Sequence, residues 1–149
     1  MKEIIFQAGK DWTGLIIRLT LGIVLFPHGA QKTLGWFGGP GFTGEMNYFT
    51  GDLKMSVVTA FLVIFIESAG ACCLIAGIAG RLWSMALIIL FLGMIIRVHH
   101  ANGFFMNWTG AQPGEGYEYH LLVIGLSMAL LINGSGRWSL DRLFYRPLL

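Results

Sequence analysis

Charged residues are scarce in this chain. Asp, Glu, Lys and Arg make up only 12% of its 149 residues, whereas 55% are hydrophobic. A soluble domain carries about 25% charged residues, so this chain has too few to cover a globule exposed to water. The net charge of +2 comes without a basic cluster, which argues against nucleic acid as a partner. The composition predicts a protein whose main partner is the lipid bilayer.

Cysteine is also scarce. The two cysteines, Cys72 and Cys73, are adjacent inside an apolar run. Neighbouring side chains on a helix diverge by about 100°, so the two thiols cannot pair with each other there. The sequence has no CxxC, HxxxH or HExxH motif. These absences argue against thiol exchange and zinc binding, and no metal site is predicted.

Long apolar runs are what the chain does have. Each run is close to the roughly 20 residues that a helix needs to cross about 30 Å of hydrocarbon. The four predicted spans are about 12–34, 56–80, 82–101 and 117–133. The sequence therefore predicts an all-α fold, a four-helix transmembrane bundle, formed by one domain over residues 1–149.

The distribution of Lys and Arg predicts the orientation of this bundle. An even number of spans puts both termini on one side, together with the short turn at Arg81. Cytoplasmic segments of membrane proteins carry the excess of Lys and Arg. The residues that fall on the terminal side are Lys2, Lys10, Arg81, Arg137, Arg142 and Arg146. We therefore expect both termini to be cytoplasmic and the loops at about 35–55 and 102–116 to face outward.

Two ionisable residues fall deep inside predicted spans. Glu67 lies near the middle of the second span, and Arg18 lies about two turns inside the first. An ionised carboxylate at the centre of a bilayer costs at least about 2.5–3.5 kcal/mol, so Glu67 must be neutral, paired or solvated. The sequence allows an Arg18–Glu67 charge pair that fixes helix register, or a role for both residues in a proton or ligand path.

A second group of polar residues gathers at the outer ends of three predicted spans. His28 and Lys32 are four residues apart and share one face of a helix. All four histidines of the chain fall at this one depth, which favours a ligand site over a purely structural network. The candidate ligand-binding residues are His28, Gln31, Lys32, Arg97, His99, His100, Glu118 and His120.

The same segments carry a family resemblance. The runs RLTLGIVLFPHGAQKTLGWFGG at 18–39, HHANGFFMNW at 99–108, GEGYEYHLL at 114–122 and SGRWSLDR at 135–142 resemble the DoxX family of small membrane proteins. The resemblance implies a four-helix protein of the bacterial plasma membrane. The family is similar to the DoxD-type subunit of thiosulfate:quinone oxidoreductase, and some members are linked to thiol and oxidative stress.

These observations favour a membrane subunit or partner of an oxidoreductase system. A quinone head group or a small anion would bind at the outer cluster, with charge from Lys32 and Arg97 and proton exchange by His28 or His100. No side chain here holds electrons, so turnover needs a redox partner protein or a bound cofactor. The alternative is a non-enzymatic assembly factor or small-molecule transporter, and the sequence leaves open both enzyme status and homo-oligomer formation.

Overall fold

The computed structural model describes residues 11–144, and every regular element in that range is a helix. Four long helices lie in the four expected ranges: α2 (Trp12–Leu34), α4 (Val57–Ala76), α5 (Gly80–Met94) and α6 (Glu118–Asn133). The path of α5 continues through a π-helical segment, η3 (Ile95–His99), and a 3-10 turn, η4 (His100–Asn102). A short helix, α7 (Asp141–Phe144), ends the described chain.

Three of these segments are long and apolar enough to cross a membrane. They are Trp12–Leu34, Val57–Ala76 and Gly80–Asn102, with 23, 20 and 23 residues. The fourth, α6, is apolar but has only 16 residues, about 24 Å at 1.5 Å per residue. Large apolar side chains on all four helices are exposed, among them Ile16, Val58, Ile89 and Leu122. This surface requires lipid around it, so the chain is a multi-pass membrane protein.

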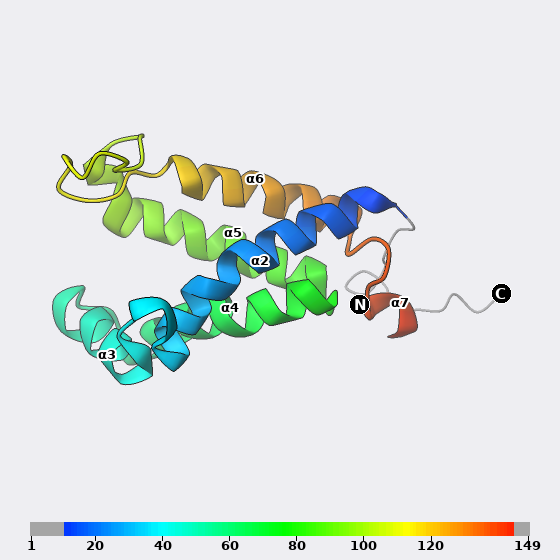
Figure 1. Cartoon of the computed structure of the whole chain (residues 1–149), viewed down its shortest axis with the longest axis horizontal. Helices are drawn as coiled ribbons and strands as arrows, with labels where there is room; N and C mark the ends of the chain where they lie inside the picture. Colours follow the sequence, from blue (N-terminus) through cyan, green and yellow to red (C-terminus); the bar gives the residue numbers. More distant parts are fainter. Residues whose placement is uncertain (1–10, 145–149) are drawn as a thin grey trace.

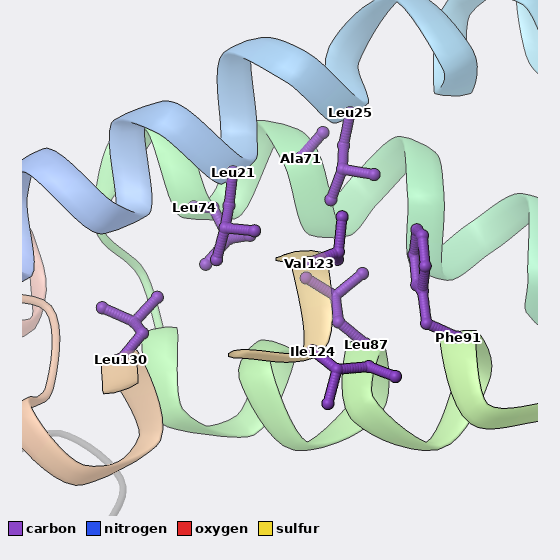
Figure 2. Packing of buried hydrophobic residues seen from close by; sticks show 9 residues of the cluster. All are labelled: Leu21, Leu25, Ala71, Leu74, Leu87, Phe91, Val123, Ile124 and Leu130. Carbon is purple, nitrogen blue, oxygen red and sulfur yellow. The ribbon is translucent and has the colours of Figure 1, made fainter. Parts of the chain in front are cut away.

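A single apolar layer forms where the four long helices meet (Figure 2). On α2 it begins with Leu21, one turn after Arg18, and ends with Leu25, one turn before His28. The buried members of the layer are Leu21, Leu25, Ala71, Leu74, Leu87, Phe91, Val123, Ile124 and Leu130. The layer therefore separates the polar residues at one end of the helices from those at the other.

The helix α2 runs diagonally across its neighbours, packing on both α4 and α6 (Figure 1). Two glycines allow its backbone to touch α4. A Cβ atom at Gly29 would lie 2.6 Å from Ser68 Cα, and one at Gly22 would lie 3.0 Å from the carbonyl oxygen of Ala71. Ser68 Oγ also donates a hydrogen bond to the Gly29 carbonyl at 3.1 Å. Small residues permit such close packing in lipid, and here they bring the last turn of α2 against the middle of α4.

The segment between α2 and α4 is more regular than the loop expected from the sequence. It contains η1 (Trp36–Gly38), α3 (Gly41–Asn47) and the π-helical η2 (Tyr48–Asp52). Buried Phe49 packs on Ala60, Val63 and Ile64 of α4 in a second, smaller core. This core holds the segment against the N-terminal half of α4 and places α3 beside the end of α2.

Candidate functional site

Glu67 forms an ion pair with Lys32, not with Arg18. Lys32 Nζ lies 2.9 Å from a carboxylate oxygen of Glu67, whose side chain is only 3% exposed. The diagonal course of α2 explains why Lys32 is the partner. Gly29 packs against the backbone of Glu67, and this contact brings the last turn of α2, with Lys32, close to Glu67. The Arg18–Glu67 pair that the sequence suggested is therefore wrong. The charge of Glu67 is balanced from the C-terminal end of α2, where Lys32 lies.

Arg18 instead links α2 to the end of α4 and to the turn after α6. Its guanidinium group donates to five carbonyl oxygens and uses all three nitrogens. Two acceptors, Leu74 and Ile75, lie in the last turn of α4, where carbonyls lack helical partners. The other three belong to the turn after α6 and are Ser135, Arg137 and Trp138. Arg18 is 2% exposed, so its role is to tie this turn to α2 and α4.

Asp141, which was not predicted as a site residue, completes the polar network at this end of the helices. Its carboxylate accepts hydrogen bonds from the backbone N–H groups of Ala79 (2.6 Å) and Gly80 (3.2 Å) at the start of α5. It also accepts a bond from the Ser135 hydroxyl. Asp141 is 1% exposed, and a carboxylate is favourable at a helix N-terminus. A lone acid in a polar tail gives no sequence signal for such a contact.

Polar residues at the C-terminal end of α2 and near the start of α6 enclose a cavity of about 190 Å³. Four of the eight predicted ligand residues line it, and Glu67 closes it from α4. The lining residues are Leu25, His28, Lys32, Glu67, Phe91, Met94, His99, Met106, Glu115, Tyr119 and His120. The cavity thus combines a buried ion pair and three histidines with apolar walls.

Aromatic contacts fix the rings inside this cavity. The centroids of His99 and His120 are 4.1 Å apart, and those of His28 and Tyr119 are 6.2 Å apart. His99 Nδ1 is 2.8 Å from the carbonyl oxygen of Glu115, which holds the 102–117 loop over the cavity. Phe91 packs on both Tyr119 and His120. The cavity is therefore preformed rather than assembled from loose surface groups.

Two buried polar atoms in this cavity have no hydrogen-bond partner among the described residues. They are the hydroxyl oxygen of Tyr119 and Nδ1 of His120. Buried polar atoms in native proteins are nearly always paired with protein, water or a ligand. Tyr119 was not predicted as a site residue, although its position beside His120 on α6 could have suggested it. One hydroxyl group and one ring nitrogen beside the cavity are thus without a hydrogen-bond partner in the described protein.

The other four predicted ligand residues lie elsewhere. Gln31 donates to the carbonyl oxygen of Phe37 at 3.2 Å and holds the turn after α2. Glu118 accepts bonds from Met106 N–H (2.9 Å) and Trp108 Nε1 (3.2 Å), so it orders the 102–117 loop. His100 is exposed in η4, and Arg97 lines a separate groove between α4 and α5. The structure does not bring these four residues to the cavity.

Glu45 adds a second carboxylate beside Lys32. It lies on α3, and one of its oxygens is 3.9 Å from Lys32 Nζ. Burial raises the pKa of Glu45; the nearby ammonium of Lys32 lowers that pKa in part, and the carboxylate of Glu67 raises it further. One lysine is thus shared by two acids, one of which takes up a proton more readily than a free glutamate.

Comparison with known proteins identifies the family. The DoxX family matches residues 13–100, more than half of the chain. This range holds Lys32, Glu67 and His99, while Tyr119, His120 and the tail segments that also suggested the resemblance lie beyond it. Searches of curated proteins and of solved structures found no match. The helices, their interior charges and this match together establish that the chain belongs to the DoxX family.

Proposed function

We propose that this protein is the membrane subunit or partner of an oxidoreductase system, linked to the quinone pool or to thiol and oxidative-stress handling. In this proposal the cavity between α2, α4, α5 and α6 binds a quinone head group. The supporting observation is the pair of unpartnered buried atoms, Tyr119 Oη and His120 Nδ1, in a cavity that also holds an ion pair and apolar walls. A cavity of about 150 Å³ holds one benzene ring, so about 190 Å³ suits a single ring.

The chemistry of a quinone fits these groups. A quinone takes up two electrons and two protons, one proton at each oxygen, to become a quinol. Tyr119 and the imidazoles of His28, His99 and His120 would hydrogen-bond the oxygens and exchange protons with the outer solution. The Lys32–Glu67 pair would hold fixed charge beside the ring. The electrons would come from a redox cofactor of a partner protein as that partner oxidises its sulfur or thiol substrate.

We further propose four spans with both termini cytoplasmic, in a bacterial plasma membrane. The α4–α5 turn with Arg81 and the tail with Arg137 and Arg142 lie at the same end of the molecule (Figure 1), which supports this orientation. The other end carries the cavity. Lys2, Lys10 and Arg146, which contribute to the charge imbalance in the sequence, lie outside the described residues.

Reporter fusions test this orientation. A reporter after Leu149 is expected to be active in the cytoplasm, and one inserted at Gly51, in the exposed segment between α2 and α4, is expected to be active outside. An insertion in the 107–112 loop should report the same side as Gly51. In the four-span arrangement three spans lie between Gly51 and Leu149, so the two reporters must be on opposite sides of the membrane. Finding both on the same side would contradict this arrangement.

Binding of a short-chain benzoquinone tests the site itself. The Tyr119→Phe variant removes only an oxygen that has no partner inside the described protein, so its melting temperature should match that of the wild type. If this oxygen bonds the quinone, its loss should weaken binding about ten-fold. Tyr48→Phe, at an exposed tyrosine on η2, is the matched control. Equal affinity for wild type and Tyr119→Phe would count against the quinone site.

The transport alternative receives less support. A path would need polar groups along its whole length, but the layer of Leu21, Leu74 and their neighbours lies between the cavity and Arg18. On α6 the single hydroxyl of Ser127 interrupts the apolar members of this layer, which is too little to line a path. The five bonds of Arg18 to backbone carbonyls also leave its guanidinium without free donors. These features favour a site with one opening over a route across the membrane.

A further inference from the structure

A second concave region lies between α4 and α5, apart from the histidine cavity. It is a groove of about 490 Å³, within the range of about 300–1,000 Å³ that is typical of ligand sites. Most of its lining is apolar and comes from the two helices: Leu62, Val63 and Ile66 on α4, and Ile89, Leu90 and Met94 on α5. Leu62 and Ile89 are 45% and 67% exposed, so the groove opens toward the surrounding lipid.

One end of this groove is cationic. Lys54, in the segment before α4, and Arg97, on η3, both line it and are both exposed. Neither forms an ion pair with any residue in the described range 11–144. The hydroxyl-bearing residues Ser56 and Thr59 line the same end, at the N-terminus of α4, where the helix dipole also favours an anion. The groove therefore offers positive charge at one end and hydrocarbon contacts along the rest.

The length of the groove matches one leaflet of a bilayer. From Ser56 to Ile66 along α4 is ten residues, about 15 Å at 1.5 Å per residue. This is half of the roughly 30 Å hydrocarbon thickness. The cationic end lies at the helix termini, where phosphate groups lie in a membrane, and the apolar end reaches the depth at which acyl chains end.

From this distribution we propose that the groove is a specific binding site for an anionic phospholipid. The phosphate and its net negative charge would lie between Lys54 and Arg97, and an acyl chain would lie along Ile66 and Leu90. A helix from a second copy of this chain would cover the apolar part but would leave both cations unmatched. The site is separate from the quinone proposal, since it shares only Met94 with the lining of the histidine cavity.

Gly93 gives the sharpest test of this site. It lines the groove within α5, and a Cβ atom there would meet no atom within 4 Å. A leucine at this position would project into open space and fill the groove without strain in the protein. Gly125 on α6 is equally open but lies outside the groove, so Gly125→Leu is a matched control.

The experiment offers the purified protein an equimolar mixture of phosphatidylglycerol and phosphatidylcholine in mild detergent and counts bound lipids by native mass spectrometry. The wild type should retain phosphatidylglycerol preferentially. Lys54→Gln or Arg97→Gln should lower this preference about five-fold, and both changes together about thirty-fold. Gly93→Leu should lower occupancy by either lipid at least about ten-fold. Gly125→Leu, and Arg142→Gln at the other end of the molecule, should behave as the wild type.

Three results would overturn the proposal. One is a wild type without preference for phosphatidylglycerol. Another is an unchanged preference in the Lys54→Gln/Arg97→Gln double variant. The third is a Gly93→Leu protein that keeps its lipid but changes from dimer to monomer, which would assign the groove to a second copy of the chain. Since Lys54 and Arg97 are exposed, their substitution leaves folding intact, and each result can be read directly.

Discussion

Replacement of Arg18 by methionine is expected to destabilise the protein severely. Methionine fills much of the same space but leaves four of the five carbonyl oxygens without a donor, in a region that is 2% exposed at Arg18. The fifth, the carbonyl of Leu74, keeps a hydrogen bond from the N–H of Gly77. Each unpaired buried acceptor costs about 1–3 kcal/mol, so the sum approaches the whole stability of a typical domain. Thermal unfolding in detergent, with size-exclusion chromatography, should show a protein that is largely unfolded or aggregated.

Two further variants sharpen this prediction. Arg18→Lys keeps the charge but has three donors on one nitrogen instead of a planar fork, so its melting temperature should fall between those of the wild type and Arg18→Met. Arg142→Met, on the partly exposed α7, should change stability by no more than about 0.5 kcal/mol. If Arg18→Met melts within a few degrees of the Arg142→Met control, the five bonds contribute little.

The Lys32–Glu67 pair is expected to show the second-largest effect. Removing one partner of a buried pair costs about 3–5 kcal/mol, because the other charge is left uncompensated. The two single changes should not be equal, however. In Glu67→Gln, Lys32 keeps Glu45 at 3.9 Å, whereas in Lys32→Met the carboxylate of Glu67 loses its only ion-pair partner among the described residues. Lys32→Met should therefore be the more damaging of the two.

A double-mutant cycle measures this coupling. Lys32→Met/Glu67→Gln should be less destabilised than the sum of the single changes by about 0.5–3 kcal/mol. Arg18→Lys combined with Glu67→Gln serves as the control, and its effects should be additive because the two side chains do not meet. Additive losses for Lys32 and Glu67, or coupling between Arg18 and Glu67, would contradict the pairing in the structure.

Composition and hydropathy were sufficient to predict the helical fold and the positions of its long helices. The pairing of the interior charges was not predictable in the same way. It depends on the angle at which α2 crosses α4, and that angle depends on contacts at Gly22 and Gly29 that have no signature beyond small side chains. It also depends on the turn after α6, which returns to Arg18 from 117–120 residues further along the chain.

Only part of the predicted ligand cluster lines the cavity. His28 and Lys32 share a face and both line the cavity, as their spacing of four indicates. Arg97 and His99 are only two residues apart, so on a helix their side chains diverge by about 200°. This is why His99 lines the cavity while Arg97 lines the lipid-facing groove. Equal depth in the membrane does not mean a shared site.

The five hydrogen bonds of Arg18 also have a consequence for how the chain enters the membrane during its synthesis. A ribosome completes α2 long before it reaches Ser135, Arg137 and Trp138, which supply three of the five acceptors. During that interval the guanidinium lacks these three acceptors and needs water or lipid phosphates as partners instead. The turn after α6 thus supplies the partners that Arg18 needs in the protein interior, and a chain cut short before this turn would carry an unsatisfied cation inside the membrane.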